Sequence, residues 1–106
     1  IIQIGKGWIA EEALAIGVYC ALHAQNLEEG VILAVNHGGD SDSTGLIAGH
    51  LLGAQYGVAT IPERWLNALE LRTVLEEVAD DLATVQQWPL ADEQALAYYL
   101  QRYPDH

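Results

Sequence analysis

The chain has 106 residues, of which 51% are apolar and 18% charged, and its 4 basic and 15 acidic side chains give a net charge of −11. This length allows one domain, and the apolar fraction is too high for an intrinsically disordered chain. The negative charge disfavours nucleic acid and anionic membranes as partners. No apolar run reaches the roughly 18 residues that a membrane-spanning helix needs.

The start of the chain and its cysteine content bear on its origin and compartment. The sequence begins at Ile1 and contains no methionine and no signal-peptide pattern, so we expect a piece of a longer protein or a processed product. The single cysteine, Cys20, excludes a disulfide framework. It favours a reducing compartment, which we expect to be the cytoplasm.

Helical periods dominate the first half of the chain. A first helix is expected over 9–25, and because it is apolar on nearly every side it should be buried all round. Residues 28–36 indicate a short helix, although the run 31–35 would suit a buried strand equally well. A third helix is expected over 43–56, with the Asp and Ser residues before it as its cap.

The second half has the same character. Pro62 is expected at the first position of a helix. The clearest amphipathic pattern covers 70–87, where apolar residues recur at three- and four-residue steps opposite charged ones. A last helix over 91–103 has an acidic start and a basic end, which suits its macrodipole. The sequence therefore predicts an all-α fold in which residues 1–106 form a single helical segment.

The segment that carries chemistry reads Asn-His-Gly-Gly-Asp-Ser-Asp-Ser-Thr-Gly at 36–45. Two carboxylates and several hydroxyls follow a glycine pair that lets the backbone bend sharply and a ligand approach closely. Oxygen ligands of this kind suit Mg²⁺, Mn²⁺ or Ca²⁺. The alternative is a helix N-cap with more acids and hydroxyls than it needs. The glycine pair and the hydroxyl run favour the metal.

Three glycines, Gly45, Gly49 and Gly53, recur every four residues in the expected third helix. Each costs roughly 1 kcal/mol relative to alanine inside a helix. We therefore expect another helix or a ligand to approach this face closely.

Three other families of metal loop fit less well. An EF-hand loop starting at Asp40 needs a bidentate Glu at its twelfth position, where Leu51 stands. An aspartyl-phosphate phosphatase places Asp-x-Asp directly after a buried strand, but residues 36–39 intervene here. A glycosyltransferase Asp-x-Asp needs an α/β frame that the helical periods do not offer.

The same segment, with its flanks, resembles the ADP-ribosylglycohydrolase family. The resemblance implies that the chain is the C-terminal helical part of that all-α fold. The matching pieces are Gly-Trp-Ile-Ala-Glu-Glu-Ala-Leu at 7–14, the segment 36–45 running into Ile-Ala-Gly at 47–49, and the stretches 61–62, 65–66 and 71–81.

The resemblance also implies an activity. The family hydrolyses the bond between ADP-ribose and a protein side chain, with arginine favoured, so ADP-ribosylated protein or ADP-ribose would be the partner. It would use two Mg²⁺ (or Mn²⁺) ions. The metal ligands on this chain would be Asp40, Asp42 and Ser43. The residues near the bound substrate would be Gly7, Trp8 and Gly39. No catalytic residue is assigned to the chain.

One part of the family pattern is absent. The second ligand cluster, a hydroxyl-Asp-Asp group, has no counterpart, since the only double aspartate, Asp80-Asp81, follows Ala79 inside an amphipathic pattern and is interpreted as a solvated face. A Mg²⁺ ion needs about six oxygens. We therefore expect the remaining ligands on an N-terminal portion of the same domain, and the chain alone to be nearly or fully inactive.

A non-enzymatic alternative remains open. The chain could be a helical interaction or assembly module derived from the family, because 106 residues cannot cover the apolar stretch 13–22 and the glycine face together. That hypothesis predicts self-association into a homo-oligomer. A weaker one is a degradation product without a role of its own.

Other reactive side chains receive structural interpretations. We expect His37 to be a loop histidine bonded to backbone, Cys20 to be a small buried apolar residue, and Trp65 and Trp88 to pack between helices.

Overall fold

The computed structural model describes residues Ile4–Pro104. No β-strand occurs within that range, which confirms the all-α prediction and decides the ambiguous run 31–35 in favour of helix. The chain divides into two compact units, Ile1–Ala68 and Leu69–His106, which are described separately. The α-helices of the described chain are α1 (Ala10–His23), α2 (Leu27–Val35), α3 (Ser41–Tyr56), α4 (Glu63–Ala68), α5 (Arg72–Thr84) and α6 (Glu93–Arg102).

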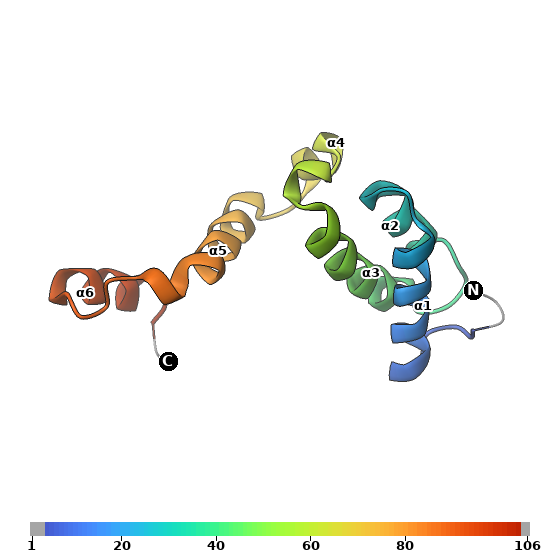
Figure 1. Ribbon diagram of the computed structural model, residues 1–106, viewed down its shortest axis with the longest axis horizontal. Helices are drawn as coiled ribbons and strands as arrows, with labels where there is room; N and C mark the ends of the chain where they lie inside the picture. Colours follow the sequence, from blue (N-terminus) through green and yellow to red (C-terminus); the bar gives the residue numbers. More distant parts are fainter. Residues whose placement is uncertain (1–3, 105–106) are drawn as a thin grey trace. The chain divides into compact units, whose positions relative to one another are not determined.

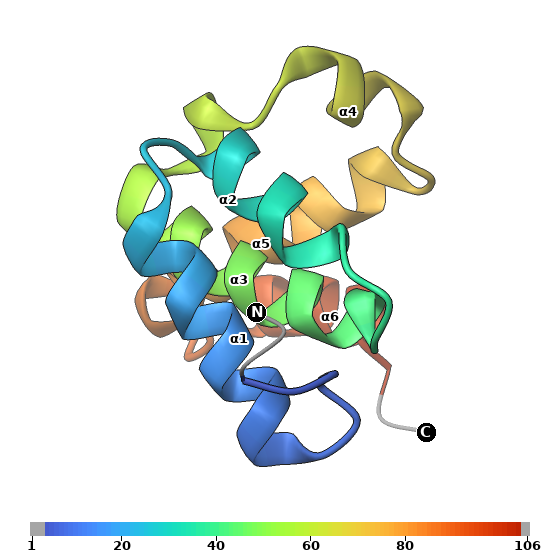
Figure 2. The same cartoon turned by 90° about the vertical axis from the view of Figure 1, so that its right-hand side faces the viewer.

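The first unit is built around α3, against which both α1 and α2 pack (Figures 1 and 2). Each fully buried aliphatic side chain in such a core contributes about 1.5–3 kcal/mol. The prediction that Cys20 is a small buried apolar residue is confirmed, since its side chain is inaccessible and unpaired. The buried cluster consists of Ile16, Cys20, Leu27, Ala34, Ala48 and Leu52.

Two glycines allow the helices of this unit to approach one another. A Cβ at Gly17 in α1 would lie 2.5 Å from Cγ2 of Ile47 in α3. A Cβ at Gly30 in α2 would overlap the side chain of Leu52. Close packing at these positions therefore depends on the missing side chain.

The expected close approach along the three-glycine face of α3 is confirmed at one position. A Cβ at Gly45 would lie 2.6 Å from Cγ1 of Val35, so α2 approaches closely there. At Gly49 and Gly53, apart from the neighbouring backbone of α3 itself, no atom of the described chain lies within 4 Å of such a Cβ. The expected approach by another helix of this chain is absent at those two positions.

Helix α1 is buried on one side. Ile16 is fully inaccessible, whereas Leu14 is 55% exposed and Leu22 is 77% exposed. The prediction of burial all round is therefore wrong for this chain, because α2 and α3 cover only the face that carries Ile16. A uniformly apolar helix shows no preferred face in its sequence, so the error could not be seen there.

Helix α3 ends at a glycine whose backbone φ angle is positive. Gly57 has φ +84°, a conformation that glycine adopts without steric cost, and it ends the helix before a short 3-10 turn at Val58–Thr60. Pro62 directly precedes α4, and its carbonyl accepts bonds from the N–H groups of Trp65 and Leu66. Trp65 packs against the core of the first unit, which confirms its expected packing role.

The second unit contains α5, a 3-10 turn at Val85–Gln87, and α6. The helix expected over 70–87 begins later, because Leu71 takes a left-handed conformation with φ 59°. Asp92 caps α6 by accepting a bond of 3.0 Å from the Ala95 N–H. Between Ile4 and Pro104 no helix combines the length and apolar character that crossing a bilayer requires.

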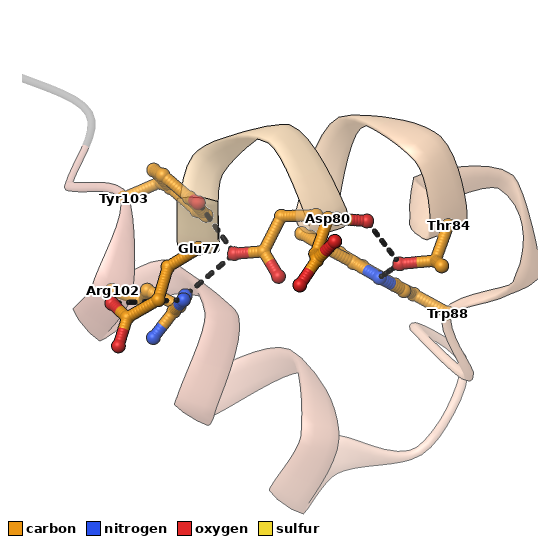
Figure 3. A network of polar contacts seen from close by, with 7 residues as sticks. Glu77, Asp80, Thr84, Trp88, Arg102 and Tyr103 are labelled. Carbon is orange, nitrogen blue, oxygen red and sulfur yellow. Dashed lines mark hydrogen bonds and ion pairs between the residues drawn. The ribbon is translucent and has the colours of Figure 1, made fainter. Parts of the chain in front are cut away.

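A carboxylate joins α5 to the end of α6. Oδ2 of Asp81 accepts bonds from Nε of Arg102 at 2.6 Å and from the Tyr103 hydroxyl at 2.5 Å. Nη2 of Arg102 also lies 3.5 Å from Oε2 of Glu77 (Figure 3). Asp80 is exposed, as a solvated face requires, but the Asp81 side chain is only 20% exposed, so that interpretation of the pair is wrong for Asp81. The partners lie 21 and 22 residues away, beyond what spacing along one helix can show.

Trp88 adds an aromatic contact to this unit. Its ring stacks on that of Tyr99 with centroids 3.8 Å apart and planes 7° apart, which confirms that Trp88 packs between helices. Its Nε1 donates to Oγ1 of Thr84 at 3.1 Å (Figure 3). The unit is thus held by a few specific contacts.

Candidate functional site

The candidate site occupies the turn between α2 and α3. Asp40 is the N-cap residue of α3, and Asp42 and Ser43 lie in its first turn, since the helix begins at Ser41. The sequence placed the helix start at residue 43. Asp42 and Ser43 therefore belong to the helix itself, whereas Asp40 directly precedes it.

Two backbone contacts tie this turn to the segment ahead of α1. The Asp40 N–H donates to the Lys6 carbonyl at 2.7 Å. A Cβ at Gly39 would overlap that same carbonyl, so only glycine fits there without displacing backbone. The group that approaches Gly39 is the chain's own backbone, and the expected approach of a ligand there stays a prediction.

Asp40 is the N-cap residue of α3, but its side chain makes no capping hydrogen bond in the helix. The Ser43 N–H donates instead to Oδ1 of Asp42 at 3.0 Å. Hydrogen bonding with the Asp42 carboxyl group, and then with Ser43, lowers the pKa of Asp40 below its ordinary value. Asp40, Asp42 and Ser43 thus lie close together at the start of α3, an arrangement compatible with both the metal site and the N-cap alternative.

The donor set fits one share of a cation site. When both carboxylates are ionised they repel each other, and a divalent cation bound by their oxygens would relieve that repulsion. Carboxylate and hydroxyl oxygens are the ligands that Mg²⁺ and Mn²⁺ prefer. No group of three or more His, Cys, Asp or Glu side chains in the described chain is arranged to hold a metal ion. The residues present would supply at most part of a coordination sphere.

The predicted substrate-binding residues lie beside this turn to different degrees. Gly7 has φ +81°, and a Cβ there would lie 3.7 Å from Cβ of Asp40 and 2.9 Å from Cγ2 of Thr44. Trp8, its neighbour in sequence, is 67% exposed. The structure therefore brings Gly7, Gly39 and Asp40 together, and their roles toward a substrate stay predictions.

Thr44 is a residue to which the sequence analysis gave no role. Its side chain is completely buried and bonded to His37, which lies seven residues earlier. His37 also accepts a bond from the Gly39 N–H, which confirms its expected contact with loop backbone. The only sign of this role in the sequence was a hydroxyl residue on the apolar face of α3. It could not be distinguished from the neighbouring serines, which also carry hydroxyl groups.

Comparison with known proteins identifies the family. The model of the ADP-ribosylglycohydrolase family matches residues 1–91. This match covers most of the chain and includes the turn that carries Asp40, Asp42 and Ser43. The chain therefore belongs to the ADP-ribosylglycohydrolase family.

Several relatives match this chain over only a small part of their own length. An uncharacterized protein of Archaeoglobus fulgidus is 40% identical over 80 residues, which are 76% of this chain and 26% of the relative. The ADP-ribosyl-[dinitrogen reductase] glycohydrolase of Rhodospirillum rubrum is 50% identical over 46 residues, 43% of this chain and 16% of that enzyme. The ADP-ribosylarginine hydrolase Tri1 of Pseudomonas putida is 29% identical over 97 residues, 91% of this chain and 26% of that enzyme. The chain thus spans about a quarter or less of these relatives, and no solved structure matches it.

Proposed function

We propose that this chain supplies one share of the metal site of an ADP-ribosyl hydrolase that removes ADP-ribose from protein side chains, with arginine the favoured attachment. Family membership supports the reaction class, and the name of the Pseudomonas putida relative supports arginine. The observation that carries the proposal is the grouping of Asp40, Asp42 and Ser43 at the start of α3, with Gly7 and Gly39 beside them.

Each residue of the turn has a defined task in this proposal. Asp40, Asp42 and Ser43 would hold Mg²⁺ or Mn²⁺, which when bound orients oxygen ligands and stabilises negative charge. Gly39 keeps side-chain volume out of the contact with Lys6, and Gly7 does the same beside Thr44. The exposed Trp8 ring is available to a ligand beside the turn.

The complete site would hold two ions. Because two Mg²⁺ ions take about six oxygens each, more than these three residues and bound waters would supply, we assign further ligands to an N-terminal portion of the same domain. The much greater length of the relatives supports this assignment. The 106-residue chain alone is then inactive or nearly so, and release of ADP-ribose from ADP-ribosyl-arginine by the purified chain would contradict this part of the proposal. We place the protein in the cytoplasm, which its single unpaired cysteine supports.

Paramagnetic NMR tests the metal ligands even where binding is weak. Adding Mn²⁺ to the chain should broaden the amide signals of residues 39–45 selectively. Asp40→Asn or Asp42→Asn should weaken this binding by more than about tenfold, the loss that outer-shell partners alone can cause. Asp80→Asn, an equal change of charge on α5, is the matched control and should leave the broadening unchanged. Broadening that is spread over all acidic surfaces, or that survives Asp40→Asn, would overturn the proposed site.

A second candidate function rests on the exposed face of α1. Leu14 and Leu22 are 55% and 77% exposed, which leaves an apolar surface that an interaction or assembly module would use. This candidate predicts a concentration-dependent mass in analytical ultracentrifugation that Leu22→Glu abolishes and Mg²⁺ does not change. A monomer at all concentrations would exclude it.

A further inference from the structure

We propose that His37 and Thr44 are positioning residues, which together hold the turn at Gly39 and Asp40 in the conformation that presents the Asp40 carboxylate to a cation. The inference rests on the proposed function, because it assigns these residues a task toward the same ligand turn. It concerns two side chains that are themselves outside the proposed ligand set.

Thr44 connects three parts of the first unit. Its side chain is fully buried, and its hydroxyl lies 2.6 Å from the Ala34 carbonyl at the end of α2. The same oxygen lies 3.2 Å from the carbonyls of Asp40 and Ser41. A hydroxyl has one proton, and the shortest distance assigns it to Ala34. Thr44 therefore fixes the end of α2 to the start of α3.

The bonds of His37 define its tautomer. Nδ1 accepts from the Gly39 N–H at 3.1 Å, so this nitrogen carries no proton. Nε2 lies 2.8 Å from Oγ1 of Thr44, whose own proton is already donated to Ala34. Nε2 must then be the donor, and both bonds select the same neutral form of the ring. The imidazole bridges the glycine pair and the first turn of α3.

These contacts have a consequence for Asp40. The backbone on its amino side is held by His37 at Gly39 and by the Lys6 carbonyl at the Asp40 N–H. On its carboxyl side, Thr44 anchors the first helical turn. With the turn fixed by other groups, the Asp40 carboxylate need not cap the helix and remains available beside Asp42 and Ser43.

The test uses four variants of the chain and two measurements. His37→Ala and Thr44→Val each remove one link, whereas Thr44→Ser keeps the hydroxyl. Thr60→Val is the matched control, because the Thr60 hydroxyl makes a 2.7 Å bond to the Gly57 carbonyl in the same unit but away from the turn. The measurements are Mn²⁺ affinity from paramagnetic broadening and hydrogen exchange of the Gly39 and Asp40 amides without metal.

The positioning role predicts a defined pattern. His37→Ala and Thr44→Val should weaken Mn²⁺ binding by about 10- to 100-fold, as loss of an outer-shell partner does, and should speed amide exchange at Gly39 and Asp40. Thr44→Ser should restore both values toward those of the wild type, and Thr60→Val should change neither. If Thr44→Val fails to fold, His37→Ala and Thr44→Ser decide the question, because His37 is only half-buried.

Two negative results are distinguishable. Mn²⁺ binding that requires Asp40 but is unaffected by His37→Ala and Thr44→Val would overturn the positioning role and leave the proposed function intact. Absence of Asp40-dependent Mn²⁺ binding in the wild-type chain would overturn the proposed function, and the positioning role with it.

Discussion

The first unit buries a cluster of six apolar side chains between α1, α2 and α3, whereas no side chain from Leu69 to Pro104 is buried. The second unit relies instead on Asp81, Arg102 and Tyr103 and on the stacked rings of Trp88 and Tyr99. Partly exposed ion pairs contribute little, because water screens them and ordering the side chains costs entropy. The comparison teaches that the candidate site lies on the unit with the tighter packing.

The second unit also leaves apolar surface around a hollow of about 210 Å³. Leu82, which lines it, is 72% exposed. The residues around the hollow are Val78, Asp81, Leu82, Val85, Trp88 and Tyr103. Truncating a leucine should therefore have very different effects in the two units.

The largest expected effect comes from Leu52→Ala in the first unit. Because Leu52 is fully buried between helices, its truncation should lower the free energy of unfolding by about 2–5 kcal/mol. Leu82→Ala, the same change in the second unit, should stay within about 0.5 kcal/mol. Urea titration followed by circular dichroism measures both, and equal losses would show that the contrast in packing does not exist.

Glycine substitutions give a smaller contrast within the first unit. Gly17→Ala places a Cβ 2.5 Å from Ile47 and should destabilise the protein by about 1–3 kcal/mol through overpacking. Gly49→Ala meets open space and should stabilise it by up to about 1 kcal/mol through helix propensity. Thermal unfolding of the two variants checks this, and a destabilising Gly49→Ala would reveal a close neighbour at that face.

Low pH should lower the stability of the second unit by a modest amount. The Tyr103 hydroxyl and then the Arg102 guanidinium lower the pKa of Asp81, so its contribution is complete above the ordinary carboxyl pKa of about 3.9 and is lost as pH falls through the lowered value. Near-ultraviolet circular dichroism of the Trp88–Tyr99 stack should weaken below about pH 4. Asp81→Asn is the control and should remove this acid transition.

The opposite end of the pH scale provides a check on the same contact. Asp81 raises the pKa of the Tyr103 hydroxyl, so the bond stabilises the unit below the ordinary tyrosine value and is lost only as pH rises through the raised one. Ultraviolet absorbance can follow ionisation of the Tyr103 hydroxyl as pH rises. Ionisation of Tyr103 at the ordinary tyrosine pKa would contradict its contact with Asp81.

The sequence predicted the helices well where their periodicity or punctuation was strong. Pro62, expected at the first helical position, stands directly before α4, and the last helix, expected from residue 91, begins at Glu93 after its cap Asp92. The failures share one cause. Which face of α1 is buried, and which glycines of α3 are opposed, depends on helix partners that no single-helix pattern contains.

The candidate site shows the same division. Residue types at 36–45 indicated only a segment rich in oxygen ligands, and the resemblance to the family implied Asp40, Asp42 and Ser43 in particular. The parts that support them could not be chosen. Thr44 acts through a histidine seven residues away, and the contact of Gly39 with Lys6 joins segments more than thirty residues apart.

The contact between Gly39 and Lys6 holds the segment that precedes α1 against the turn between α2 and α3. Proteolytic removal of the chain up to Lys6 would leave the Asp40 N–H without its acceptor while sparing every helix. Under the proposed function, cleavage after Lys6 would therefore weaken cation binding at residues 36–45 while the helicity measured by circular dichroism stays nearly unchanged.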